Sequence, residues 1–133
     1  NPDELRQYFG TYAERVVLAV LLENAEKKTV IDNFPQILKD LLAVYPNLSL
    51  KLSPKLADQT QFTYIKTAQA LNISATIVDE AKAHSPYGLI VHSNQAENLD
   101  KVLFSELYPD ILAPSETEPI LEKKGFFAKL FGK

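Results

Sequence analysis

Arg15-Val-Val-Leu-Ala-Val-Leu-Leu22 is the stretch that decides the fold, because every residue after Arg15 is apolar. A continuous apolar run of this length is typical of a strand buried on both faces of a sheet. Ala19 and the leucines would also suit a buried helix, but the three valines favour a strand. We therefore place a central strand at Arg15–Leu22 and assign the neighbouring elements around it.

The residues after this strand alternate between helical and strand patterns. A helix capped by Asp32 or Asn33 ends before Pro46, because proline cannot continue a helix. In residues 48–52 leucine alternates with serine or lysine, which predicts a half-buried strand. Residues 54–60 read as a loop. Further elements are predicted over about residues 61–71 (helix), 75–78 (strand), 87–92 (strand) and 97–107 (helix).

The helix over about 61–71 is predicted to turn an apolar stripe toward the sheet. Phe62, Ile65, Ala68 and Leu71 are spaced for one helical face. Asn72 then suits a left-handed stop. At the other end of the chain, an opening helix begins near Asn1 and stops at Gly10, a residue that tolerates a positive φ.

Composition predicts one globular domain. The chain has 133 residues, is 46% apolar and contains no cysteine. The lack of cysteine excludes thiol nucleophiles, disulfides and cysteine-bound metals, and it fits a cytoplasmic location. Residues 123–133 hold four of the 14 basic residues and no acid, so residues 1–122 carry ten basic and 17 acidic residues. A body this acidic disfavours nucleic acid as a partner.

Three short motifs resemble those of the YueI-like family of bacterial proteins of unknown function: Gly10-Thr-Tyr-Ala-Glu-Arg-Val-Val-Leu-Ala, Thr63-Tyr-Ile-Lys-Thr-Ala and His84-Ser-Pro-Tyr-Gly-Leu-Ile-Val. They follow the family's order and spacing over roughly residues 1–105. The resemblance implies a four-stranded mixed sheet with packed helices, in the class of small chorismate-mutase-like folds. That class also includes kink-turn-binding ribosomal proteins and small trimeric enzymes. The family implies no catalytic residue.

Together these patterns predict an α/β (α+β) domain. Its four-stranded mixed sheet has the order β-α-β-α-β-β with flanking helices, an N-terminal helix and a C-terminal tail. The domain is assigned to residues 1–108, an acidic, proline-containing linker to 109–122, and a basic amphipathic tail to 123–133.

Five residues form a tentative binding set: Arg15, Tyr64, His84, Ser85 and Tyr87. An arginine at a strand end can grip a carboxylate or phosphate, and a histidine beside hydroxyl groups can serve acid–base chemistry or ligand binding. We favour structural roles for all of them. In these roles Arg15 forms an ion pair that fixes the start of the strand. Tyr64 lies at the margin of the apolar stripe of its helix and forms a hydrogen bond, and the imidazole of His84 bonds to a carbonyl group.

The turn of the His84 loop is assigned to two residues: Pro86 sets it, and Gly88 allows close backbone approach. His84 and His92 are the only histidines and lie eight residues apart, which fits no two-histidine metal motif, so we expect no metal. Glycine-rich phosphate loops are missing as well, and we expect no cofactor.

The tail is the sharpest functional signal outside the fold. Its apolar residues are Phe126, Phe127, Leu130 and Phe131, with lysines between them. A short basic amphipathic helix suits an anionic membrane surface or a groove of a partner. The alternative is that the tail docks on its own domain or on a neighbouring subunit.

No nucleophile, metal set or phosphate loop is assembled in the sequence, so the leading prediction is a non-catalytic binding or regulatory module in the cytoplasm. Its partner is an unidentified protein or small ligand, and a homo-oligomer is a further alternative. RNA binding by fold-level analogy is the first alternative function, with a basic face drawn from Lys39, Lys51, Lys55 and Lys66. A small-molecule enzyme with a cleft near His84 is the second.

Overall fold

The computed structural model describes residues 2–79 and 84–112, and side chains from Leu5 onward. The strands are β1 (Val16–Leu21), β2 (Leu48–Leu52), β3 (Ser74–Ile77) and β4 (Tyr87–Ser93). The helices are α1 (Pro2–Gln7), α2 (Leu22–Ala25), α3 (Lys28–Val44), α4 (Asp58–Ala70), α5 (Phe104–Leu107) and α6 (Pro109–Leu112), and a 3-10 turn spans Ala13–Arg15.

The strands form one mixed sheet in the order β1-β4-β2-β3. β4 pairs antiparallel with both β1 and β2, whereas β2 and β3 run parallel. The parallel pair is joined by α4, as parallel strands require a crossover. The predicted four-stranded mixed sheet, its element order and the N-terminal helix are therefore confirmed. The strand predicted to be central is not: β1 stands at one end of the sheet and pairs with β4 alone among the strands.

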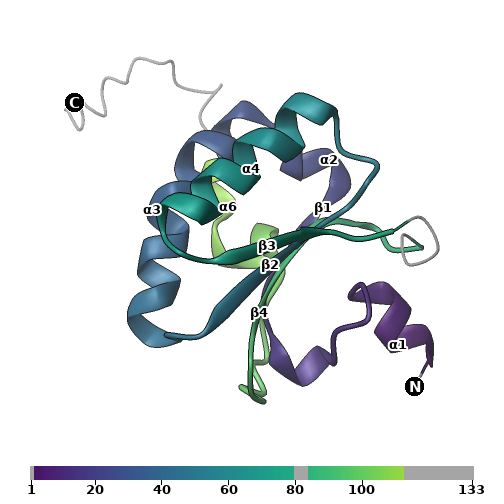
Figure 1. Cartoon of the computed structure of the whole chain (residues 1–133). Coiled ribbons are helices and arrows are strands. Elements are labelled where there is room, and N and C mark those ends of the chain that lie inside the picture. The colour runs from purple at the N-terminus through teal and green to yellow at the C-terminus, as the bar shows by residue number, and fades with distance from the viewer. Residues whose placement is uncertain (1, 80–83, 113–133) are drawn as a thin grey trace.

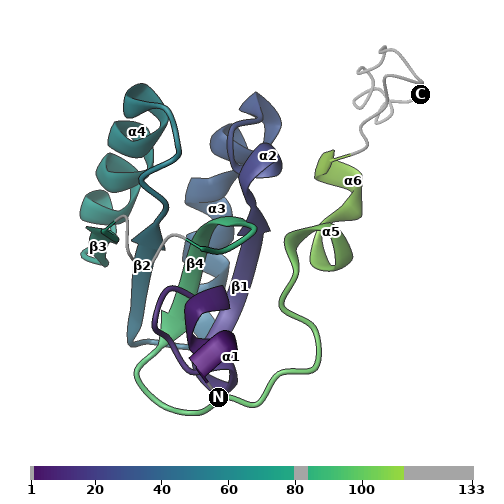
Figure 2. The ribbon, with the colours of Figure 1, turned by 90° about the vertical axis from the view of Figure 1, so that its right-hand side faces the viewer.

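The two faces of the sheet are covered differently. Helices α2, α3, α4 and α6 lie on one face, and α1 lies on the other (Figure 1). The larger core lies under the helices and includes Leu50, Leu89 and Val91. On the opposite face, Phe9 packs with Ile90 in a smaller cluster. Figure 2 shows α5 and α6 beyond β1, on the side away from β3.

Helix α3 begins earlier than predicted, at Lys28 and not after a cap at Asp32 or Asn33. Its buried residues are Val30, Phe34, Ile37 and Leu38, so the apolar stripe reaches upstream of the predicted start. Pro35 therefore lies inside the helix. Burial of this extra turn offsets the backbone hydrogen bond that proline cannot donate.

The N-terminus of α4 has a long-range cap that no local pattern could predict. The Ala57 amide donates to Glu26 Oε2 at 2.7 Å, and Thr60 Oγ1 donates to Glu26 Oε1 at 2.5 Å. The first bond satisfies a backbone amide that is otherwise without a partner at the helix start, and the second ties the first turn of the helix to the same carboxylate. As a result the helix begins at Asp58, within the predicted 54–60 loop.

The predicted helix over 97–107 is wrong over residues 97–103, since only α5 is helical within this range. The amides of Glu97 and Asn98 donate to Glu14 O at 2.7 and 3.0 Å, and Ala19 N donates to Val102 O at 2.8 Å. These bonds hold the segment beside β1 in a non-helical conformation. Tertiary hydrogen bonds therefore replace the local helical ones that the apolar spacing suggested.

The packed body also extends past the predicted domain boundary at residue 108. Helix α6 occupies the first residues assigned to the linker, and Ile111 and Leu112 pack against the main core. The remainder of the linker and the tail 123–133, with Phe126, Phe127, Leu130 and Phe131, lie outside the described residues. Within the described part of the chain, no helix has the length and hydropathy needed to cross a membrane.

Candidate functional site

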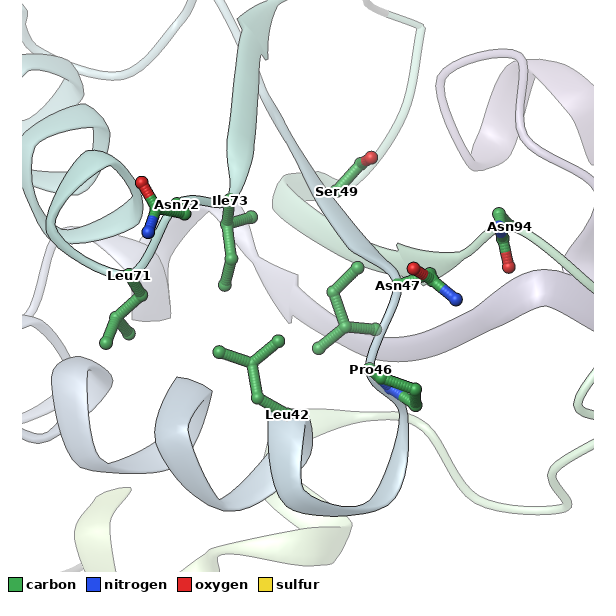
Figure 3. A pocket seen from close by; sticks show the side chains of 9 residues that line it. Leu42, Pro46, Asn47, Ser49, Leu71, Asn72, Ile73 and Asn94 are labelled. Atoms are coloured by element: carbon green, nitrogen blue, oxygen red, sulfur yellow. The ribbon is translucent and has the colours of Figure 1, made fainter.

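A pocket of about 410 Å³ opens at the end of the sheet where β2 and β3 begin. Its volume falls in the range of small-molecule sites. Figure 3 shows the side chains of Leu42 and Ile73 directed toward each other, with Leu71 and Asn72 on one side of them and Asn47 and Asn94 on the other. Its full lining is Leu42, Pro46, Asn47, Leu48, Ser49, Leu71, Asn72, Ile73 and Asn94.

Three chain reversals supply the asparagines of this pocket. Asn47 follows Pro46, just after α3 ends at Val44, and Asn94 follows the end of β4. Asn72 follows α4 with a φ of 59°, the left-handed conformation that asparagine tolerates better than most residues. The predicted left-handed stop at Asn72 is therefore confirmed.

The end of α4 is fixed by two backbone hydrogen bonds. Asn72 N donates to Gln69 O at 3.0 Å, and Ile73 N donates to Ala68 O at 2.9 Å. This pair of bonds is the Schellman motif, which closes a helix with a left-handed residue. The backbone that carries the Asn72 amide is thus held in place by the helix itself.

The chemistry of the lining is that of a neutral site. No ionisable side chain is among its residues. Each asparagine offers an amide donor and an oxygen acceptor, and the leucines and Ile73 supply an apolar floor. Helices α3 and α4 both end here, so their C-terminal carbonyl groups place partial negative charge at the pocket. The site suits an uncharged, flat ligand with hydrogen-bonding edges.

Ser49 contributes the one hydroxyl group of the lining, and it is not activated as a nucleophile. Its register partner across the sheet is His92. His92 Nδ1 lies 3.1 Å from Ser93 O, and the buried Nε2 has no hydrogen-bond partner within the described residues. A nucleophilic serine needs a base that accepts its proton, and no such bond is formed.

The five residues of the sequence-predicted binding set are not brought together. Arg15 directly precedes β1 at the end where Val16 pairs with His92, whereas Tyr87 pairs with Leu21 at the other end. These ends are separated by roughly 17 Å, the length of a six-residue strand. Arg15 and the His84 loop therefore lie at opposite ends of β1 and do not form one site.

Tyr64 belongs to the core and not to a binding surface. Its side chain is fully buried, and its hydroxyl donates to Ala25 O at 2.6 Å. Burial, with a further contribution from the charge of Glu26, raises the pKa of Tyr64. Phe62, predicted to face the sheet, is 56% exposed instead. The buried face of α4 is thus rotated relative to the prediction.

The His84 loop holds α1 against the sheet. Ser85 Oγ donates to Gln7 O at 2.5 Å and accepts a bond from Tyr87 N at 3.1 Å. The rings of Tyr8 and Tyr87 stack with centroids 5.5 Å apart. His84 itself is exposed. These contacts give Ser85 and Tyr87 structural roles in holding α1.

Gly88 and Pro86 connect the same loop to α2. Leu22 N donates to Pro86 O at 2.9 Å, and a methyl group placed on Gly88 would lie 2.8 Å from Ala25 Cβ. Gly88 does not have a positive φ. Glycine is required here because the helix approaches the strand closely, and not because of its backbone conformation.

The lysines of the expected RNA-binding face lie on opposite sides of the sheet. Lys39 and Lys66 belong to α3 and α4. Lys51 is directed to the other face, where Nζ donates to Thr11 Oγ1 at 2.7 Å and to Phe9 O at 3.3 Å. The four lysines therefore do not form one basic face, and the RNA alternative loses its expected surface.

His92 gives the fold a testable dependence on pH. Burial lowers its pKa, and the charges of Lys51 and Arg15 act in the same direction against the opposing bond to Ser93 O. On acidification the unfolded chain binds a proton at His92 before the folded chain does. The free energy of unfolding should therefore fall as the pH drops below about 6.5, the ordinary value of histidine.

Urea unfolding at about pH 7.5 and pH 5 measures this effect. The stability lost between the two pH values should be smaller in His92→Gln than in the unaltered chain. His84→Gln is the control, because it removes an exposed imidazole and should leave the loss unchanged. An equal loss in all three proteins would show that His92 does not contribute.

Sequence reasoning missed Asn47 and Asn94 altogether and treated Asn72 as a helix stop alone. The three residues lie in separate turns, 22 to 25 positions apart. Each one has an ordinary explanation as a turn residue. The only signal in the sequence is that all three turns contain asparagine.

The comparisons with known proteins give a family and a fold without a function. The family model described as "Protein of unknown function (DUF1694)" matches residues 1–103. The "Uncharacterized protein YueI" of Bacillus subtilis (strain 168) is 25% identical over 106 residues, which are 80% of this chain and 77% of that protein. The crystal structure of the YueI protein from Bacillus subtilis matches with a TM-score of 0.66 at 25% identity and covers 77% of each chain.

Proposed function

Since the chain belongs to the DUF1694 family of proteins of unknown function, we propose its function from its own pocket. The protein is a non-catalytic binding module that holds a small uncharged ligand in the asparagine-lined pocket. The observation that carries this proposal is the neutral lining, in which asparagines lie on two sides of apolar side chains (Figure 3). General acid–base and nucleophilic catalysis need groups that this lining lacks.

The ligand that fits this lining is flat and carries donors and acceptors along its edge. An asparagine side chain can form two parallel hydrogen bonds with such an edge, as it does with adenine. The apolar floor of Leu42, Leu71 and Ile73 supports the face of a ring by burying its surface. A nucleobase-like heterocycle combines both properties.

Titration with the four common ribonucleosides, followed by two-dimensional NMR of the amide signals, tests this function. We expect at least one nucleoside to shift the side-chain NH₂ signals of Asn47, Asn72 and Asn94 in a saturable way. Removal of one amide should weaken binding by about 1 kcal/mol, or roughly fivefold in Kd, the usual value of one hydrogen bond. The variants are Asn47→Ala, Asn94→Ala and Asn72→Gly, the last of which keeps the left-handed backbone.

Asn33→Ala is the matched control. Asn33 is exposed on α3, where its Nδ2 donates to Thr29 O at 2.7 Å, and it does not line the pocket. Its replacement should leave the Kd unchanged. Saturable shifts elsewhere that spare the pocket, or no saturable shift with any of the four nucleosides, would overturn the proposal.

A further inference from the structure

A second hollow of about 330 Å³ lies between α3 and α4. Its lining consists of Pro35, Lys39, Lys66, Thr67, Ala70 and Leu71. Leu71 also lines the asparagine pocket. Leu71 is therefore shared by the linings of the two hollows.

On both helices, residues that line the second hollow lie close to residues that line the asparagine pocket. On α3, Lys39 stands three residues before Leu42, which lines the asparagine pocket. Residues spaced three apart are neighbours on one helical face, about 4.5 Å apart along the axis. At the end of α4, Thr67 and Ala70 line the second hollow, and the residues that follow the helix, Leu71 and Asn72, line the asparagine pocket. One ligand can span the two hollows.

Lys39 and Lys66 bring uncompensated positive charge to the groove that the two hollows form. Lys66 Nζ lies 5.4 Å from the centroid of the Phe62 ring. Among the described residues, neither Lys39 nor Lys66 has a carboxylate within salt-bridge distance. Asp40, next to Lys39, accepts a bond from Gln36 Nε2 at 2.9 Å. After burial, its charge is the second cause that raises the pKa of Tyr108. The two ammonium groups therefore flank the hollow with no acid between them.

The sign of the charge also differs between the two ends of the groove. Carbonyl groups at the ends of α3 and α4 make the asparagine pocket unfavourable for an anion. Lys39 and Lys66 lie five and four residues before the last residues of α3 and α4, Val44 and Ala70, so their positive charge is set back by about one turn from the helix ends. A ligand with an uncharged head and an anionic end fits this order in one orientation only.

We infer that the ligand is a nucleoside phosphate, with its base in the asparagine pocket and its phosphate bound between Lys39 and Lys66. A phosphate monoester carries a charge of roughly −1.5 to −2 near neutral pH, which two lysines can neutralise, and lysine binds phosphate as a point charge. The inference rests on the proposed function and narrows its ligand class.

The experiment compares the Kd of a nucleoside with that of its 5′-monophosphate by the same NMR titration. We expect the phosphate form of the tightest nucleoside to bind about tenfold more tightly at low salt, and this advantage to shrink at high salt. In the double variant Lys39→Gln/Lys66→Gln the two Kd values should become nearly equal, while nucleoside binding stays unchanged. Inorganic phosphate alone should weakly shift the backbone signals of Lys66 and Thr67.

Lys55→Gln is the matched control, since Lys55 is exposed in the turn after β2 and lines neither hollow. It should keep the phosphate advantage. A nucleoside that binds at the asparagines with no gain from its phosphate would overturn this inference and leave the proposed function standing. If the 5′-monophosphate still bound more tightly than the nucleoside in the double variant, that result would also overturn this inference and leave the proposed function standing. If no nucleoside or nucleotide binds, both proposals fall.

Discussion

Gly88→Ala is expected to lower the free energy of unfolding by about 3 kcal/mol, at the upper end of what overpacking a core costs. The new methyl group would lie 2.8 Å from Ala25 Cβ and 3.1 Å from Leu22 Cα. The second of these atoms is backbone and cannot move aside alone, so α2 must shift away from β4. Without this contact the same change in a strand would stabilise the protein by roughly 0.5 to 1 kcal/mol.

Urea denaturation followed by circular dichroism measures this loss, and Ala25→Gly provides the control. That second change removes the methyl group that the new side chain would meet. The double variant Gly88→Ala/Ala25→Gly should therefore be more stable than the sum of the two single changes predicts, by at least 1 kcal/mol. Simple additivity, or a Gly88→Ala protein as stable as the unaltered chain, would contradict the close approach of α2 and β4.

The sheet was predictable because its signals are local. β1 has no polar residue, and β2 alternates Leu48, Leu50 and Leu52 with polar residues. In the structure β1 is buried along almost its whole length, and the three leucines of β2 face the helices while Ser49 and Lys51 do not. Strand periodicity reports burial directly, so these elements needed no tertiary information.

The helices were predicted less well wherever a distant residue decides their limits. Glu26 caps α4 from 31 positions away, and Glu14 O binds the amides of Glu97 and Asn98. Neither contact leaves a trace in the local sequence. The asparagine pocket was missed for the same reason, since its polar residues meet only after three separate turns have formed.

Tyr64→Ala is the substitution with the other large expected effect, a loss of about 4 kcal/mol in the free energy of unfolding. Truncation of a buried aromatic side chain removes its transfer free energy and leaves a cavity. The ring packs edge-on against Phe34, with centroids 4.9 Å apart. Truncation also leaves Ala25 O without the hydroxyl that now donates to it. Tyr64→Phe should separate these contributions, because it keeps the packing and loses about 1 to 2 kcal/mol for the unsatisfied carbonyl.

Phe62→Ala, two residues away on α4, is the matched control for this prediction. Phe62 was expected to face the sheet from the apolar spacing of the sequence, yet its side chain is 56% exposed. Its truncation should change the free energy of unfolding by no more than about 0.5 kcal/mol. Tyr64→Ala and Phe62→Ala therefore report directly on which face of α4 is buried, measured by urea unfolding under the same conditions. A larger loss from Phe62→Ala than from Tyr64→Ala would mean that α4 packs in the orientation predicted from its sequence, with Tyr64 free to meet a ligand.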